Sequence, residues 1–311
     1  MLVKTNVILN KANRGRYAVG AFNVNNLEIL QAVIEAALKE KSPVIVQTSE
    51  GAIAYAGLGY LIAMVKEAAK APIPVALHLD HGKEFSLIKQ AIKYGYSSVM
   101  FDGSILPYSQ NVSQTKRVVK IAHARRVPVE AELGSLPGKE DLVNVAAREA
   151  LMTDPEQARI FVTQTGCDFL AVAVGTAHGA YKFAGASRLD YDRLKTIKKL
   201  TQMPLVLHGA SGVPLEMLKI NKKYCRLLND CQRFENAKGV SDGSIKMAIK
   251  SGINKINIDT DLRIAFLTGI RHQIAVDHKV YDPRELLAPA KALMTKVARH
   301  KMRLFGCSGK A

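Results

Sequence analysis

The 311-residue sequence predicts an α/β fold, a closed (β/α)8 or TIM barrel with a helical insertion after the seventh strand. Three observations support this prediction. Short apolar or β-branched runs alternate with amphipathic stretches, the pattern of a parallel sheet covered by helices. Eight such units follow one another, the number that closes a barrel. Nearly every run also ends in a polar or titratable residue, at the end of the strand where barrel active sites lie.

The predicted strands are short runs rich in Val, Ile and Leu. They are YAVGAF (17–22), PVIVQ (43–47), PVALHL (74–79), SSVMFD (97–102), VPVEAE (127–132), FLAVAV (169–174), PLVLH (204–208) and NKINI (254–258). Between them, residues 26–41 carry apolar side chains at helical spacing. Residues 154–166 open with Asp154 as a helix N-cap and Pro155 at the first helical position.

The pattern of strands and helices predicts one catalytic barrel domain over residues 1–311, with the insertion at about residues 215–238. A dinucleotide-binding fold is disfavoured, because no G-x-G-x-x-G motif follows a strand. The nearest match, GLGYLI at 57–62, lacks the third glycine.

The composition describes a strongly basic chain, with 44 Lys and Arg against 27 Asp and Glu and a net charge of +17. This charge favours anionic partners, either phosphorylated substrates or nucleic acid. The lysines are scattered and Trp is absent, so nucleic acid is not expected. A basic barrel with a nucleic-acid or surface-binding role stays open as an alternative function.

No apolar run is long enough to span a membrane, and the first residues do not form a signal peptide. The four cysteines form no C-x-x-C pair, so we expect reduced thiols and a cytoplasmic location.

Polar residues stand at the carboxyl ends of the predicted strands, whereas the opposite ends carry chiefly Pro, Ser and Lys. This asymmetry predicts one shared site. In chain order the residues are Asn23, Gln47, Ser49, Asp80, His81, Asp102, Glu132, His178, His208, Asn257, Asp259 and Asp261.

Three of the eight histidines, His81, His178 and His208, fall at the ends of different strands and could converge on one metal ion. Three imidazoles with one open position are a known catalytic zinc arrangement. His78 lies two residues before Asp80, on the strand face expected to point into the barrel, which suits a supporting role. Asp102 and Glu132 could hold hydrogen bonds or a salt bridge, or provide an alternative or second metal position.

Small residues follow three strands, in HGAYK (178–182), HGASG (208–212) and NIDT (257–260). Such turns let backbone N–H groups approach a phosphate, although each could also be an ordinary tight turn. Lys182 and Arg263 could add positive charge. The stretch 133–154 is long enough for a lid, with Gly134 and Gly138 as flexible points. Its Glu140 is either a mobile catalytic carboxylate or a solvated charge.

The rim motifs HLDHG, VEAELG, AVGTAHGAYK, LHGASGVP and KINIDTDLR resemble, in order and spacing, those of the class II, metal-dependent fructose-bisphosphate aldolases. The likeness runs from VGAFNVNN to FGCSGKA, essentially the whole chain. It implies reversible, zinc-assisted cleavage of fructose 1,6-bisphosphate to dihydroxyacetone phosphate and glyceraldehyde 3-phosphate, as in glycolysis and gluconeogenesis. It also implies a K⁺ or Na⁺ ion on backbone carbonyls near Ala177, Gly179, Gly209 and Ser211.

The resemblance assigns roles to residues of this sequence. Zinc would be held by His81, His178 and His208, with Asp102 and Glu132 at an alternative metal position. Asp80 would exchange a proton with the substrate oxygen at C4, and Glu140 would take the proton from the ketose phosphate carbon. The implied substrate-binding residues are Asn23, Ser49, Gly179, Lys182, Gly209, Ala210, Ser211, Asn257, Ile258, Asp259, Thr260 and Arg263.

The sequence departs from the family pattern at two places. The lid reads GSLPGKED, where the family more often has consecutive glycines and an acidic residue at the position of Lys139. The stretch 215–238 is inserted, as in one branch of the family, and we expect a helical hairpin at a subunit contact of a homodimer or homotetramer.

Two alternatives concern the chemistry. Asp259 resembles the fructose-bisphosphate enzymes, whereas tagatose-bisphosphate relatives tend to have a small residue there, so tagatose 1,6-bisphosphate is the second candidate substrate. A Schiff-base mechanism would need a lysine inside the barrel, and Lys255 is the one candidate within a predicted strand.

Overall fold

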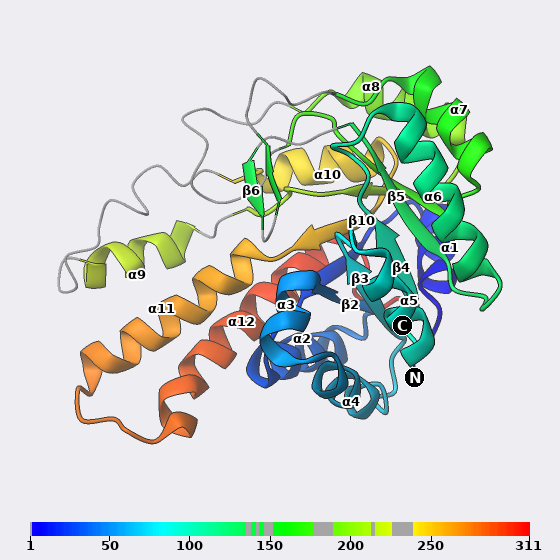
Figure 1. The fold of residues 1–311 in the computed structure, drawn as a ribbon. Coiled ribbons are helices and arrows are strands. Elements are labelled where there is room, and N and C mark those ends of the chain that lie inside the picture. Colours follow the sequence, from blue (N-terminus) through cyan, green and yellow to red (C-terminus); the bar gives the residue numbers. More distant parts are fainter. Residues whose placement is uncertain are drawn as a thin grey trace.

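The fold is taken from a computed structural model, which describes residues 2–134, 138–140, 143–145, 152–176, 189–212, 215–225 and 239–311. Eight parallel strands form a closed barrel in the order β1-β10-β9-β8-β5-β4-β3-β2 (Figure 1). The barrel strands are β1 (Val19–Asn23), β2 (Val44–Ser49), β3 (Val75–Asp80), β4 (Ser98–Phe101), β5 (Val129–Leu133), β8 (Phe169–Val172), β9 (Leu205–Leu207) and β10 (Ile253–Ile258). The predicted barrel is confirmed, and every predicted strand boundary lies within two residues of the observed one.

Helices surround the barrel and connect its strands. They are α1 (Thr5–Gly15), α2 (Leu27–Glu40), α3 (Glu50–Ala56), α4 (Leu58–Ala68), α5 (Phe85–Tyr94), α6 (Tyr108–His123), α7 (Pro155–Thr165), α8 (Tyr191–Thr201), α9 (Leu215–Cys225), α10 (Asp242–Lys250), α11 (Thr260–Val276) and α12 (Pro283–Phe305). The predicted start of α7 is confirmed, because the Asp154 side chain accepts a hydrogen bond from the Gln157 N–H at 2.8 Å and Pro155 is the first helical residue.

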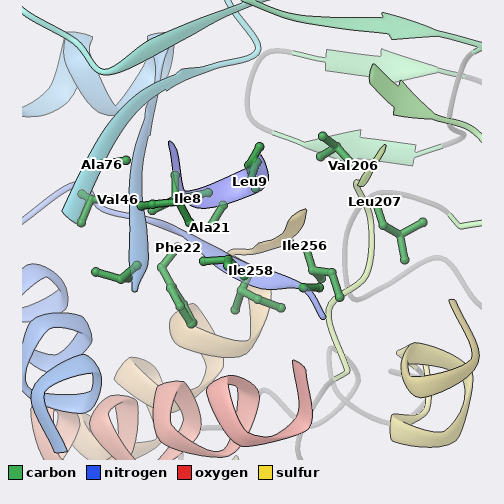
Figure 2. Close-up of a cluster of buried hydrophobic side chains, with 14 of the residues drawn as sticks. Ile8, Leu9, Ala21, Phe22, Val46, Ala76, Val206, Leu207, Ile256 and Ile258 are labelled. Atoms are coloured by element: carbon green, nitrogen blue, oxygen red, sulfur yellow. The ribbon is translucent and has the colours of Figure 1, made fainter. Parts of the chain in front are cut away.

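Helix α1 packs against the amino-terminal end of the barrel. Its Ile8 and Leu9 are buried in the same hydrophobic cluster as side chains of β1, β2, β9 and β10, as Figure 2 shows. The hydroxyl of Thr5 lies 2.6 Å from that of Ser98 at the start of β4. The carboxyl ends of the strands, at the opposite end of the barrel, carry the polar residues described below.

Two short strands that the sequence did not predict follow β5. They are β6 (Gly138–Glu140) and β7 (Val143–Val145), which pair antiparallel with Gly138 opposite Val145. The prediction treated residues 133–154 as a lid without strands, because strands of three residues are too short to show a periodicity. Glu140 therefore lies in a hairpin strand.

Part of the predicted insertion is helical, since α9 covers residues 215–225 and the remainder lies outside the described residues. The buried Asn221 of α9 donates hydrogen bonds to the Met217 carbonyl and to the Thr268 hydroxyl of α11. Helix α9 is thereby attached to α11, which runs beside α12 (Figure 1).

None of the helices in the described part of the chain combines the length and the apolar character needed to cross a membrane.

The side chain of Glu40 ties the end of α2 to α12 and to the last residues of the chain. It accepts hydrogen bonds from Arg299 at 2.7 Å, from Arg303 at 2.6 and 2.9 Å, and from the Ser308 hydroxyl at 2.8 Å. The hydrogen bond from Arg303, aided by those from Arg299 and Ser308, outweighs the opposing effect of burial and lowers the pKa of Glu40 from 4.5 to about 2.

This lowered pKa predicts how stability responds to acid. Ionised Glu40 stabilises the folded chain above its unfolded pKa of 4.5, and the contribution is lost as the pH falls towards about 2. Glu40→Gln is expected to lower the melting temperature by roughly 2–8 °C at pH 7. The difference from the unsubstituted chain should shrink as the pH falls from 4.5 towards 2.

Thermal melts of both chains across this pH range provide the measurement. Glu35→Gln is the control on the same helix, because Glu35 forms an exposed ion pair with Lys39 that contributes little. A difference of the same size at pH 7 and near pH 2 would contradict the role given to Glu40.

Candidate active site

Polar side chains at the carboxyl ends of the barrel strands are buried close together. Asp80, His81, Asp102, Glu132 and His208 are each between 1 and 5% exposed. His78 and Asp80 of β3 point into the barrel, as expected. Asp80 accepts a hydrogen bond from Asn257 of β10, and His78 lies 3.2 Å from a carboxylate of β5. The strand ends therefore form one site.

Two of the three predicted zinc ligands face each other. The Nε2 atom of His81 lies 3.0 Å from Nδ1 of His208, and the two rings are nearly perpendicular at 83°. Each ring also has a carboxylate on its outer nitrogen. His81 Nδ1 is 2.9 Å from Asp102 Oδ2, and His208 Nε2 is 2.9 Å from Glu130 Oε1. Because ionised carboxylates only accept hydrogen bonds, both outer nitrogens carry a proton.

The turn after β3 fixes where His81 points. His81 has a left-handed backbone with φ of 49°, which is strained for a residue with a side chain. It is followed by Gly82, where an added Cβ would lie 2.5 Å from the carbonyl oxygen of Met100. A residue with a side chain is therefore excluded at position 82, and the backbone turns directly against β4.

His81 and Asp102 each stabilise the charged form of the other. Burial alone would lower the pKa of His81, but the charges of Asp80, Asp102 and Glu132 and the hydrogen bond to Asp102 outweigh it and hold that pKa well above its usual value. Burial alone would raise the pKa of Asp102, but the hydrogen bond and charge of His81 and the hydrogen bonds from Ser104 hold it well below its usual value. Burial lowers the pKa of His208, which keeps that ring neutral.

The two facing nitrogens lie close enough to share one proton or one metal ion. A metal ion bound by both nitrogens would displace any proton held between them.

The donor set fits a zinc ion. Two ligand groups, Asp80 with His81 and His208, and His81 with Asp102 and Glu132, each have ligand atoms within 4.8 Å of one another. Nitrogen ligands of one tetrahedral zinc lie roughly 3.3 Å apart, given Zn–N bonds of about 2.0–2.1 Å. The observed separation of 3.0 Å between His81 and His208 is close to that value. Imidazole nitrogens and carboxylate oxygens are also the ligands that zinc takes.

Three amide side chains hold Asp80. Its Oδ2 atom accepts hydrogen bonds from Asn23 at 3.0 Å and Gln47 at 3.1 Å, and its Oδ1 atom accepts one from Asn257 at 3.0 Å. The amide oxygens of Gln47 and Asn257 are buried and have no hydrogen-bond partner among the described residues. They can accept hydrogen bonds from hydroxyl groups of a ligand. Gln47 was predicted to lie at the shared site but was assigned no role there, although its place two residues before Ser49 puts both on one strand face.

A cavity of about 440 Å³ adjoins these residues. Four predicted substrate-binding residues line it, namely Asn23, Ser49, Asp259 and Arg263. The Arg263 guanidinium forms two contacts with Asp259, both at 2.8 Å, while the Ser49 hydroxyl accepts a hydrogen bond from the Ala52 N–H at the start of α3. The structure thus brings Ser49 and Arg263 to one cavity, each with a partner of its own.

Two of the three predicted phosphate-binding turns follow neighbouring strands, and the third, at 178–182, lies outside the described residues. Residues 209–211 come after β9, with Gly209 in the left-handed region at φ 62°, and residues 257–260 span the end of β10 and the start of α11. The buried Asp261 joins the two turns, because it accepts hydrogen bonds from the Gly212 N–H at 3.0 and 3.2 Å. Asp261 also lies 3.1 Å from the ammonium of Lys301 on α12.

Some predicted residues cannot be placed. His178, Gly179 and Lys182, with Ala177 of the expected cation site, lie outside the described residues. Glu140 lies in β6, and its side chain also lies outside the described part of the structure.

Two buried residues of the site were not among its predicted metal-binding or substrate-binding residues. Glu130 of β5 and Lys255 of β10 form an ion pair of 2.8 Å, and neither side chain is exposed. Side chains alternate between the two faces of a strand, so a strand that directs Glu132 inward also directs Glu130 inward. This alternation could have identified Glu130 from the sequence. Lys255 was the candidate for a Schiff base, but its ammonium is bound to Glu130.

A closed (β/α)8 barrel with facing histidines and flanking carboxylates at its carboxyl-terminal rim defines a metal-dependent barrel enzyme. The sequence model of the class-II fructose-bisphosphate aldolases matches residues 3–310. The chain therefore belongs to the class II fructose-bisphosphate aldolase family, whose members are zinc-dependent lyases.

Individual relatives agree with this assignment. The chain is 47% identical over 311 residues to the fructose-bisphosphate aldolase of Thermus caldophilus and 44% identical over 312 residues to that of Helicobacter pylori, with 100% of each chain covered in both comparisons. Among solved structures, the YdjI aldolase from Escherichia coli matches with a TM-score of 0.80 and 33% identity, again over 100% of both chains.

Proposed function

We propose that this protein catalyses the reversible aldol cleavage of fructose 1,6-bisphosphate to dihydroxyacetone phosphate and glyceraldehyde 3-phosphate. The observation that carries the proposal is the pair of facing histidines, His81 and His208, beside a buried Asp80 on the rim of a barrel of this family. The names of the two curated relatives support the choice of substrate.

The metal ligands in this proposal are His81, His178 and His208, with Asp102 and Glu132 at an alternative or second divalent position. When bound, zinc supplies Lewis-acid stabilisation of the negative charge that develops on the ketose oxygens. A K⁺ or Na⁺ ion on backbone carbonyls near Ala177, Gly179, Gly209 and Ser211 also belongs to the proposal.

Two carboxylates move the protons. In the cleavage direction Asp80 accepts the proton of the C4 hydroxyl as the C3–C4 bond breaks and C4 becomes an aldehyde carbon. Glu140 then donates a proton to C3 of the remaining three-carbon fragment, and it takes that proton back in the direction of condensation. The three amides around Asp80 fix its two oxygens in place, which supports its role as the positioned acid and base.

The two phosphate groups bind at different parts of the rim. The turns that contain Gly209, Ala210 and Ser211 and residues 257–260, together with Gly179 and Lys182, hold the dihydroxyacetone phosphate half. Ser49 and Arg263, in the cavity of about 440 Å³, face the other half, with Asn23 nearby. A homodimeric or homotetrameric assembly, a single domain over 1–311 and a cytoplasmic location stay predictions.

Removal of the metal is expected to abolish activity. Exhaustive treatment with EDTA should lower the cleavage rate by more than about 100-fold, and added zinc should restore it, because the carbanion charge then regains its Lewis acid. The rate is followed by coupled detection of the triose phosphates. Full activity after chelation, or covalent trapping of substrate by borohydride on a lysine, would contradict the mechanism.

Variants at Asp80 and His81 separate proton transfer from metal binding. Asp80 lies close enough to His81 and His208 to be a ligand itself, so the two roles make different predictions. His81→Ala should lower zinc affinity by at least about 100-fold. Asp80→Ala should keep the zinc and lower kcat by about 10²- to 10⁴-fold. Equal loss of zinc in both variants would contradict the assignment.

The choice between the two candidate sugars is also testable. Fructose and tagatose 1,6-bisphosphate differ only in configuration at C4, whose oxygen contacts Asp80 in this proposal. We expect kcat/KM to be at least about 10-fold higher for fructose 1,6-bisphosphate than for tagatose 1,6-bisphosphate. Asp259→Ala should lower the ratio of these two kcat/KM values. Parallel assays with both sugars provide the measurement, and a preference for tagatose 1,6-bisphosphate would overturn the substrate assignment.

A further inference from the structure

A buried carboxylate beneath the rim connects a lysine to one of the facing histidines. Glu130 Oε2 lies 2.8 Å from the ammonium of Lys255, and Glu130 Oε1 lies 2.9 Å from Nε2 of His208. The Glu130 and Lys255 side chains are 0% exposed, and that of His208 is 1% exposed. One carboxylate therefore uses its two oxygens for two different partners, without access to solvent.

A third buried group, the ring of His78, lies next to Glu130. His78 Nε2 lies 3.2 Å from Glu130 Oε2, and His78 Nδ1 lies 2.6 Å from the hydroxyl of Ser98. Ser98 in turn contacts Thr5 of α1 at 2.6 Å. A continuous series of buried polar groups thus runs along the barrel interior, from the helix at its amino-terminal end to the rim.

The charge of this group of residues is balanced. A carboxylate buried alone would be costly, and the ammonium of Lys255 compensates it directly. With the ammonium of Lys255 2.8 Å from its Oε2 atom, Glu130 is a carboxylate and accepts a hydrogen bond from His208 without donating one.

This acceptor determines which nitrogen of His208 faces His81. With its proton on Nε2 and donated to Glu130, a neutral imidazole presents the lone pair of Nδ1 on its other side. A ring flipped by half a turn about its Cβ–Cγ bond would present a carbon atom there and would lose the hydrogen bond to Glu130. The same arrangement, in which a carboxylate orients a histidine ligand, recurs in metal sites.

We propose that Glu130 is a positioning residue for the metal, which fixes His208 so that it binds zinc through Nδ1, and that Lys255 is the counter-charge that makes this possible. The assignment rests on the proposed function, because it takes His208 to be a zinc ligand. It gives Lys255 a role in the site without a covalent bond to substrate.

The test removes the ion pair as a unit. In the variant Glu130→Leu/Lys255→Met, two apolar side chains replace two opposite charges, so net charge is unchanged and no single charge is left buried. Such replacements are often neutral or stabilising for the fold. We expect a melting temperature near that of the unsubstituted chain and a zinc affinity lower by about 10- to 100-fold, measured by competition with a chromophoric chelator.

A control removes an ion pair outside the site. Glu40 at the end of α2 accepts hydrogen bonds from Arg303 of α12 at 2.6 and 2.9 Å, and the Glu40 side chain is 6% exposed. The variant Glu40→Leu/Arg303→Met also replaces two opposite charges by apolar side chains, and it should leave zinc affinity within about twofold. A folded Glu130→Leu/Lys255→Met variant that binds zinc like the unsubstituted chain, or an equal loss of zinc in the control, would overturn the proposal.

A second measurement needs no variant of the ion pair. In the zinc-loaded protein labelled with ¹⁵N-histidine, His208 should keep its proton on Nε2 and bind zinc through Nδ1. Coordination through Nε2 would overturn the proposal even if the double variant fails to fold. His208→Ala separates this inference from the proposed function, because unchanged zinc affinity in that variant would remove His208 from the metal site altogether.

Discussion

The contact between His81 and His208 is the constraint on which the rest of the site depends. The two nitrogens lie 3.0 Å apart although the residues are 127 positions apart in the sequence. Their strands, β3 and β9, are not neighbours in the sheet, since β4, β5 and β8 lie between them. Closure of the barrel brings the two strand ends face to face, so a site of this kind requires the complete ring of strands.

The neighbours of each polar group determine its chemistry. Asp102 and Glu130 each accept a hydrogen bond from one imidazole and thereby aim the two inner nitrogens at each other. Asp80 instead accepts its hydrogen bonds from three amide side chains. Carboxylates of the same type therefore serve as an orienting group in one place and as a candidate acid and base in another.

Features that are encoded by residues close together in the chain could be predicted from the sequence. Alternating strands and helices predicted the barrel, and polar residues at strand ends predicted His81, Asp102, Glu132 and His208. The role of Glu130 could not be predicted, because its partner Lys255 is 125 residues away and the pairing depends on the closed barrel. The hairpin of β6 and β7 was missed because neither strand is long enough to show alternation.

The contacts of Asp261 that link the turns after β9 and β10 have a consequence for binding. Because Asp261 holds the Gly212 N–H and the ammonium of Lys301 at once, the first turn of α11 and the turn after β9 are fixed to each other and to α12. The two turns are therefore ordered in advance of any ligand. The conformational entropy of ordering them is lost when the chain folds, so a ligand that binds there does not have to offset it.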